Sequence, residues 1–350
     1  MNPYVLSLLI SALGLGTALT FSSSHWLLAW MGLEINTLAI IPLMTQKHSP
    51  RSVEAAAKYF LTQAAAAATI MFASATNAWL TGTWDILHLS HPFCATVAFM
   101  ALALKVGLAP VHFWLPEVIQ GVALSTGLIL STWQKLAPFT LILQVIPNVD
   151  HTLVLATGLA STFVGGWGGI NQTQVRKLLA YSSIAHLGWM IIVSQFSPSL
   201  SLLALTLYIV MTTSTFLTMK ASAASSLNTL STSWAKTPTL VALASLALLS
   251  LGGLPPLSGF MPKWLILQEM AKQGLPLIAT LAALSALLSL FFYLRISYAM
   301  TLTVSPNTVG ASPSWRFPSS QSTLLLAAST IMALGLLPLT PTFLSLYSFA

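Results

Sequence analysis

Four ionisable side chains lie inside long apolar stretches of this sequence: Glu34, Lys105, Lys135 and Lys263. A charge at the centre of a bilayer costs at least ~2.5 kcal/mol on insertion scales, so such residues face the protein interior, pair with one another or line water. A buried lysine that loses its charge near neutral pH can load and unload a proton. We predict that these four side chains form a path for protons or cations.

Glu34 and Lys105 are expected at a similar depth, so a change in their separation would switch the lysine between binding and releasing a proton. His112 and His186 extend the set, because imidazole titrates near neutrality. Other interpretations stay open: a buried Lys–Glu pair can serve only helix packing, a membrane histidine can simply hydrogen-bond between helices, and Glu117 can reach the interface. Hydroxyl groups that could hold bridging water are those of Ser125, Thr126, Ser131, Thr132, Ser182, Ser183, Ser250 and Ser258.

Apolar segments follow one another along the whole chain, and they must position these side chains. The chain is 56% hydrophobic and 5% charged, whereas soluble domains carry about 25% charged residues. About 20 apolar residues span a bilayer as a helix. We therefore predict an all-α membrane protein of about eleven transmembrane helices, near 3–22, 25–45, 59–81, 94–121, 124–145, 151–170, 174–195, 199–220, 239–272, 276–302 and 321–346.

Two of these helices carry prolines in their middle, in the segments 105–117 and 250–264. Proline removes a backbone donor and clashes one turn back, so both helices should break. Freed backbone groups at membrane depth are tolerated only beside protein or water. Each broken helix would be the fourth of a block of five, which predicts two inverted repeats, a transporter design.

The repeats would cover residues 1–150 and 151–303 of one transmembrane domain, with a C-terminal helix in 304–350. In this scheme Glu34 and His186 hold matching places, and Lys105 and Lys263 match roughly. The prediction rests on the spacing of the broken helices and on no residue-level similarity between the halves.

Basic residues are scattered between the apolar segments, so the net charge of +7 indicates membrane topology and no nucleic-acid partner. With eleven helices, the N-terminal side receives Lys47, Arg51, Lys58, Arg176, Lys177, Lys220, Lys236 and Arg316 against Glu54. The opposite side receives Asp85, Asp150, Glu269 and Lys272. Lys and Arg favour the side of synthesis, which places the N-terminus inside and the C-terminus outside. The single cysteine, Cys94, excludes an internal disulfide.

Three segments carry a family resemblance: LAPVHFWLPEVIQG (108–121), QVRKLLAYSSIAHLGWM (174–190) and GGLPPLSGFMPKW (252–264). Together with the opening MNPYVLSLL and the length, they resemble the chain 2 family of NADH–ubiquinone oxidoreductase. These are mitochondrially encoded, antiporter-like membrane subunits of respiratory complex I. The resemblance covers essentially the whole chain, and each single motif is shared with the related Mrp-type cation/proton antiporters.

The resemblance implies a subunit that couples electron transfer in other subunits to proton pumping. The family's proton path then falls on Glu34, Lys105, Lys135 and Lys263, with His112 and His186 along a central polar axis. It also implies that NADH, FMN, Fe–S clusters and ubiquinone are handled by other subunits, with no cofactor or metal in this chain. The inside face becomes the matrix and the outside face the intermembrane space of the mitochondrial inner membrane.

Partners implied by the resemblance are the other mitochondrially encoded and accessory subunits of complex I. Basic loops at the inner surface could also hold phospholipids such as cardiolipin. Two alternatives remain from the sequence. The chain could be a stand-alone cation/proton antiporter, or it could be an assembly scaffold that passes no protons itself.

Overall fold

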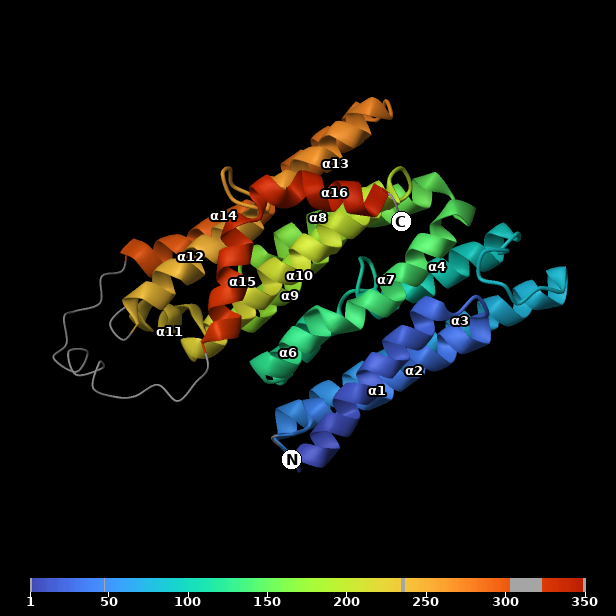
Figure 1. Cartoon of the computed structure of the whole chain (residues 1–350), viewed down its shortest axis with the longest axis horizontal. Helices are drawn as coiled ribbons and strands as arrows, with labels where there is room; N and C mark the ends of the chain where they lie inside the picture. The colour runs from blue at the N-terminus through green and yellow to red at the C-terminus, as the bar shows by residue number, and fades with distance from the viewer. Residues whose placement is uncertain (1, 47, 234–236, 303–322, 349–350) are drawn as a thin grey trace. The chain divides into compact units, whose positions relative to one another are not determined.

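The computed structural model describes residues 2–46, 48–233, 237–302 and 323–348. In these ranges the chain consists of helices and short loops, with two isolated β-bridges, His25–Asp85 and Gln174–Ser226. The helices form two compact units, residues 1–161 and 162–350 (Figure 1). Lys47, Lys236 and Arg316, which contribute to the predicted orientation, lie outside the described residues, as do residues 303–322 of the predicted C-terminal segment.

The first unit is built mainly from antiparallel neighbours in chain order. Its elements are α1 (Pro3–Ser22), α2 (Trp26–Met44), α3 (Pro50–Thr81), α4 (Pro92–Val106), α5 (Trp114–Gly121), α6 (Leu124–Ser131), α7 (Trp133–Val145), the 3₁₀ turn η1 (Ile146–Asn148) and the start of α8 (His151–Ile170). Helix α1 packs on α2, α2 on α3, and α4 on both α3 and α7 (Figure 1). At Gly16 a Cβ atom would lie 2.8 Å from the Gly32 carbonyl oxygen. The backbones of α1 and α2 therefore approach closely, as small residues allow in membrane helices.

Helix α3 is longer than predicted and begins at Pro50, nine residues before the expected start at 59. Ser49 provides the reason, because its side chain accepts a hydrogen bond from the Ser52 amide. Such a cap satisfies one of the free amides at a helix start, and proline is favoured in the first turn. Helix α3 thus begins with polar turns that precede its apolar part.

The predicted break in the fourth segment is confirmed between α4 and α5. Helix α4 ends at Val106, and Gly107 follows in the left-handed region with φ 89°. The Leu108 amide donates to the Ala103 carbonyl oxygen at 2.9 Å, which is the Schellman arrangement at a helix end. After a cis Ala109–Pro110 bond, the helix resumes as α5.

The second predicted break is also confirmed and has the same local form. Helix α12 (Pro238–Gly252) ends before Gly253, whose φ is 78°. The Leu254 amide donates to the Leu249 carbonyl oxygen at 3.4 Å. A cis Pro255–Pro256 bond follows, and helix α13 (Phe260–Lys272) begins shortly after.

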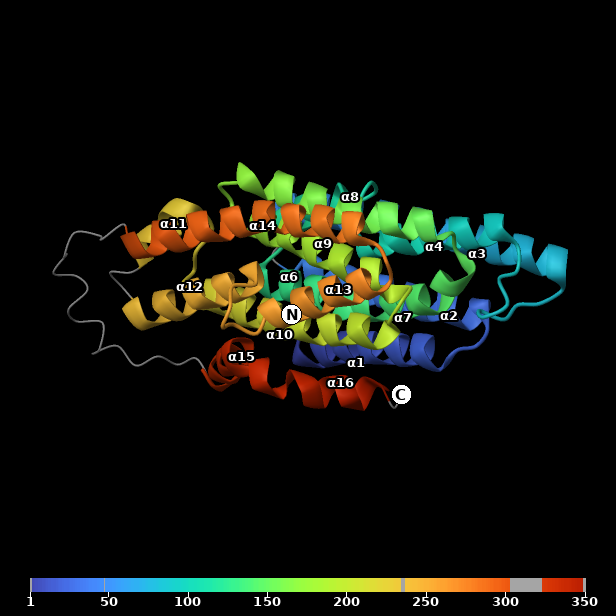
Figure 2. The same ribbon diagram turned by 90° about the horizontal axis from the view of Figure 1, so that it is seen from above.

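In the second unit, helix α10 (Pro198–Ala221) has the most neighbours and contacts α9, α12, α13, α15 and α16 (Figure 2). The remaining elements are α9 (Val175–Ser194), α11 (Leu227–Thr232), α14 (Pro276–Leu302), α15 (Leu324–Gly335), the 3₁₀ turn η4 (Leu337–Leu339) and α16 (Thr340–Ser348). Helices α15 and α16 are bent by 68° where one continuous span was predicted. Pro338 explains the bend, since it cannot continue the backbone ladder of α15.

Seven helices within the described ranges are long and apolar enough to cross a membrane, or eight if the bent pair α15–α16 counts as one span. All of them coincide with predicted spans. The other predicted spans correspond to α3 and to the two broken helices, whose halves are each too short to cross alone. The coarse prediction of an all-helical, multi-pass membrane protein is confirmed.

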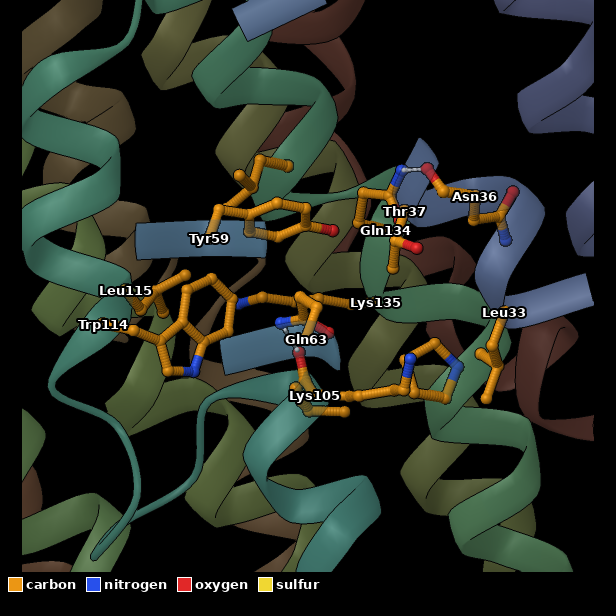
Figure 3. A pocket seen from close by; sticks show the side chains of 13 residues that line it. Leu33, Asn36, Thr37, Tyr59, Gln63, Lys105, Trp114, Leu115, Gln134 and Lys135 are labelled. Carbon is orange, nitrogen blue, oxygen red and sulfur yellow. Dashed lines mark hydrogen bonds between the residues drawn. The ribbon is translucent and has the colours of Figure 1, made fainter. Parts of the chain in front are cut away.

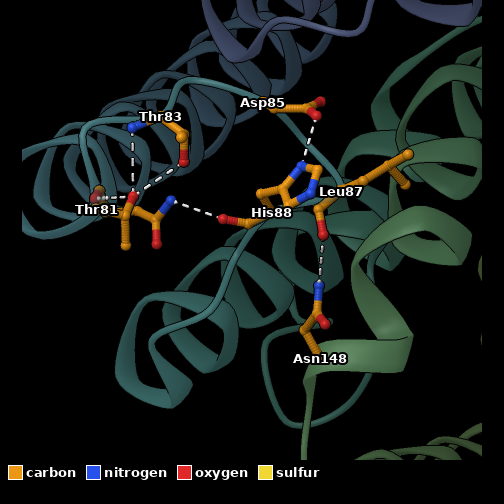
Figure 4. Close-up of polar contacts among 7 residues, drawn as sticks. Thr81, Thr83, Asp85, Leu87, His88 and Asn148 are labelled. Carbon is orange, nitrogen blue, oxygen red and sulfur yellow. Dashed lines mark hydrogen bonds and ion pairs between the residues drawn. The ribbon is translucent and has the colours of Figure 1, made fainter.

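The loop between α3 and α4 closes one end of the first unit through polar contacts (Figure 4). The His88 ring Nδ1 lies 2.7 Å from a carboxylate oxygen of Asp85, and this hydrogen bond holds the pKa of the Asp85 carboxyl below its ordinary value. The Asn148 amide donates to the Leu87 carbonyl oxygen at 3.1 Å. His88 thus has a carboxylate partner within the loop.

Candidate functional site

A small buried cavity in the first unit contains two of the predicted lysines (Figure 3). Its volume of about 20 Å³ is enough for one water molecule, and polar groups around it could hold that water. The residues that line it are Leu33, Asn36, Thr37, Tyr59, Gln63, Lys105, Val106, Trp114, Leu115, Leu130, Gln134, Lys135 and Pro138. The structure therefore brings together Lys105 and Lys135, which are 30 residues apart in the sequence.

Lys105 lies in the last turn of α4, directly before the break, and is 6% exposed. Its Nζ is buried and has no hydrogen-bond partner among the described residues. The end of a helix presents carbonyl groups without intrahelical partners, and its dipole favours a cation. The broken helix thus places an amine at its negative end, beside a space that fits water.

Glu34 lies on α2 and does not line the cavity. Thr37 donates a hydrogen bond from Oγ1 to the Glu34 carboxylate at 2.8 Å. The carboxylate interacts electrostatically with both Lys105 and Tyr59, but among the described residues it forms no ion pair. Glu34 and Lys105 therefore interact electrostatically without forming an ion pair.

Lys135 lies in the first turn of α7 and is 2% exposed. The predicted span near 124–145 is present as one apolar stretch, Leu124–Asn148, but a one-residue break at Thr132 divides it into α6 and α7. Thr132 Oγ1 donates to the Leu128 carbonyl oxygen at 2.7 Å, and Ser131 Oγ donates to the same oxygen at 3.0 Å. Such back-bonding by Ser and Thr bends helices. Lys135 thus also follows a helix break.

Polar residues around the two lysines were not singled out from the sequence. Gln63 on α3 donates from Nε2 to the Lys105 carbonyl oxygen at 3.4 Å, and Gln134 donates to the Asn36 carbonyl oxygen at 3.2 Å (Figure 3). The buried Asn36 side-chain oxygen has no partner among the described residues. Amides inside apolar helices are the sequence signal that could have identified this polar lining.

His112 is buried in the break between α4 and α5, as predicted, but it does not line the cavity. Its Nδ1 lies 3.3 Å from the Pro110 carbonyl oxygen, and its ring centre is 4.4 Å from that of Phe113. The structure therefore does not join His112 to Lys105 and Lys135 in one cavity.

In the second unit, Lys263 lies in the first turn of α13 and is half-buried. Its Nζ donates to the carbonyl oxygen of Gly252, the last residue of α12, at 2.9 Å. A Cβ atom on Gly253 would lie 3.0 Å from Lys263 Cδ, so the side chain passes directly over this glycine. The Lys263 amine therefore lies at the C-terminal, negative end of α12, although the residue itself belongs to α13.

His186 lies on α9 in the second unit and is 9% exposed. Its ring centre is 5.6 Å from that of Tyr208 on α10. Ser182 and Ser183, one turn earlier on α9, are both fully buried. His186 thus belongs to a buried polar group, which agrees with its predicted interior position.

Glu117 on α5 takes part in an exposed cluster outside the cavity. Lys58 Nζ lies 2.7 Å from the Glu117 carboxylate and 2.8 Å from that of Glu54. These hydrogen bonds hold the pKa of Lys58 above its ordinary value. The exposed position fits the interpretation in which Glu117 reaches the interface. In the described ranges no group of three His, Cys, Asp or Glu side chains could hold a metal ion.

Two family models together match almost the entire chain. Residues 23–289 match the model of the family described as NADH:quinone oxidoreductase/Mrp antiporter, and residues 290–344 match that of the NADH dehydrogenase subunit 2 C-terminus. The NADH-ubiquinone oxidoreductase chain 2 of Oncorhynchus mykiss is 69% identical over 97% of this chain and 98% of the relative. The counterpart from Danio rerio is 63% identical over 99% of both.

Solved structures give the same result for the fold. A chain of respiratory complex I from Thermus thermophilus superposes with a TM-score of 0.83 at 28% identity, covering 99% of this chain and 80% of the other. A chain of the Mrp complex from Dietzia gives a TM-score of 0.77 at 18% identity, covering 97% of this chain and 74% of the other. The fold is therefore shared with antiporter-like chains of both kinds of complex.

Proposed function

We propose that the buried lysines of this chain carry protons, because the chain belongs to the NADH-ubiquinone oxidoreductase chain 2 family. This family lies within the NADH:quinone oxidoreductase/Mrp antiporters. The chain is a proton-translocating membrane subunit of respiratory complex I, an NADH:ubiquinone oxidoreductase. Other subunits of that complex are its partners.

The observation that carries the residue-level proposal is the shared cavity of Lys105 and Lys135. The unpaired Lys105 Nζ and a space for one water molecule in the cavity that both lysines line support proton transfer between them through water. Glu34 acts on Lys105 through space, so moving the carboxylate would change which protonation state the amine prefers. Lys263 and His186 would continue the path in the second unit, with His112 as a lateral residue of the first break.

We further propose eleven transmembrane helices in two inverted repeats, 1–150 and 151–303. The two breaks support this arrangement, since each has a left-handed glycine, a leucine and a proline at the same spacing: Gly107–Leu108–Pro110 and Gly253–Leu254–Pro256. In this register Lys263 matches Glu117 and not Lys105. Lys105 and Lys263 therefore do not hold matching sequence positions in the two proposed repeats. They are alike only in that each amine lies at the end of a half-helix.

The family also suggests the setting of the chain. We propose the mitochondrial inner membrane, with the N-terminus in the matrix and the C-terminus in the intermembrane space. NADH, FMN, Fe–S clusters and ubiquinone would be handled by other subunits. Phospholipids such as cardiolipin would bind at basic loops of the inner surface.

The test is proton pumping by the assembled complex in vesicles, measured together with NADH oxidation. We expect Lys105→Met and Lys135→Met to preserve assembly and to lower the number of protons pumped per NADH. Lys220→Met, at the exposed end of α10, is the matched control and should pump normally.

Normal pumping in both buried variants would refute the proposed path. It would favour a scaffold subunit whose polar residues serve packing only. Cation/proton exchange by the purified chain, without the other subunits, would instead favour a stand-alone antiporter.

A further inference from the structure

We propose that the hydroxyl groups of Tyr208 and Tyr293 relay protons between His186 and Lys263 in the second unit. This inference rests on the proposed proton path and names two residues for it that are not among the lysines, glutamate and histidines discussed above. The relevant helices are mutual neighbours: α9 contacts α10, α13 and α14, and α12 contacts α10 and α14.

Tyr293 on α14 lies beside the break that holds Lys263. A Cβ atom on Gly252 would lie 3.6 Å from Tyr293 Cδ2, so the ring packs against the residue whose carbonyl accepts the Lys263 amine. The Tyr293 side chain is 1% exposed. Its hydroxyl approaches Ser182 but forms no hydrogen bond of normal geometry with any described residue.

A buried hydroxyl without a partner is unusual, because burial of an unpaired polar group is costly. Replacing it by hydrogen would remove that cost if the hydroxyl had only a packing role. A hydroxyl that exchanges partners, including transient water, during proton transfer would account for this unpaired group on a side chain that packs at the break of α12.

Tyr208 on α10 provides the next step and is fully buried. Its hydroxyl interacts with Ser183 on α9 and electrostatically with Tyr293. The ring also contacts His186, at 5.6 Å between ring centres. Since Ser182 and Ser183 lie three or four residues before His186, all three share one face of α9. Both tyrosine hydroxyls thus reach the face of α9 that carries His186.

The proposed step conserves atoms and charge. An imidazolium at His186 gives one proton to the oxygen of the Tyr208 hydroxyl, which passes its own proton toward Tyr293. Tyr293 in turn passes its original proton, through water, to a neutral amine at Lys263. Both hydroxyls are regenerated, the imidazole becomes neutral and the amine becomes an ammonium. Positioned side chains and water chains are known to transfer protons in this manner.

The experiment compares Tyr208→Phe and Tyr293→Phe in the assembled complex with Tyr298→Phe as control. Tyr298 lies on α14, as Tyr293 does, but is exposed. Phenylalanine keeps the ring that packs against Gly252 and Phe292, so assembly should be retained. We expect both buried variants to slow coupled proton pumping by about tenfold or more, with an increased solvent isotope effect, while Tyr298→Phe behaves as the unmodified complex.

The double variant Tyr208→Phe/Tyr293→Phe should be no slower than the slower single variant, because two relays in series act as one unit. Pumping at the control rate in both single variants would overturn the inference. Lys263→Met separates the two levels of the proposal. If it abolishes pumping while the tyrosine variants pump normally, the relay alone is wrong, whereas normal pumping in Lys263→Met as well would refute the path itself.

Discussion

Replacing Gly253 by alanine tests whether the break of α12 positions the Lys263 amine for proton transfer. Gly253 has a φ of 78°, and a non-glycine residue in this region costs roughly 1–2 kcal/mol. The added Cβ would lie 3.0 Å from Lys263 Cδ and 3.1 Å from Nζ. These contacts are closer than ordinary packing, so the side chain has to move by a few tenths of an ångström.

The displacement weakens the hydrogen bond from Lys263 Nζ to the Gly252 carbonyl oxygen, which measures 2.9 Å. Hydrogen bonds to charged groups contribute about 1.5–3 kcal/mol, so losing part of this one is sufficient to change the protonation equilibrium of the amine several-fold. We therefore expect Gly253→Ala to lower the number of protons pumped per NADH oxidised, with the assembled complex retained.

Gly274→Ala is the matched control, because Gly274 has nearly the same φ, 73°, and nothing lies within 4 Å of its added Cβ. Both variants should lose a similar amount of thermal stability in the assembled complex. Only Gly253→Ala should lose pumping, and the difference between the two isolates the contact with Lys263. Equal pumping in the two variants, at equal stability, would refute the view that this hydrogen bond sets the state of the amine.

Two further predictions concern the first unit. Gly16→Val should separate α1 from α2 and lower the yield of assembled complex. The reason is that even a Cβ added at Gly16 would lie 2.8 Å from the Gly32 carbonyl oxygen. Asp85→Asn should slightly increase amide hydrogen exchange in residues 82–91 at pH 7, because it removes the contact with His88. Since that contact lowers the pKa of Asp85, its contribution is complete above about pH 4 and is lost only as the pH falls through the lower folded value. Exchange in this loop that rises between pH 7 and pH 5 by titration of Asp85 would contradict this assignment.

The sequence was sufficient to identify the charges inside apolar helices and the breaks of the fourth and ninth segments, but not the interruption at Thr132 or the bend at Pro338. Charges in apolar segments are rare and costly, and proline breaks a helix through its own covalent structure, so both signals are local. The break before Lys135 was missed because it depends on Ser131 and Thr132 donating to one carbonyl oxygen. Hydroxyl residues occur in many unbroken helices, and only the surrounding packing decides whether they bend the backbone.

The cavity itself could not be predicted from the sequence for a related reason. Its polar lining comes from α2, α3, α4 and α7, so the proximity of Gln63, Asn36 and Gln134 depends on how these helices pack. The depth of Glu34 was predicted, but its separation from Lys105 was not, because that distance depends on side-chain rotamers. The ionisable residues inside the apolar helices are thus readable from the sequence, whereas the contacts between them require the fold.

In the proposed path, the ends of half-helices would suit these lysines to proton transfer. Burial disfavours an ammonium, and a bare buried amine would simply stay neutral. The terminal carbonyl groups of α4 and α12 oppose this effect, because they favour a cation at the positions of Lys105 and the Lys263 amine. In the proposed path these two contributions act against each other on the same amine, so a movement of Glu34 or of a hydrogen bond would shift the protonation state that the amine prefers. An unbroken α12 would satisfy its carbonyl groups internally, and the Lys263 amine would lose the Gly252 carbonyl oxygen to which it donates.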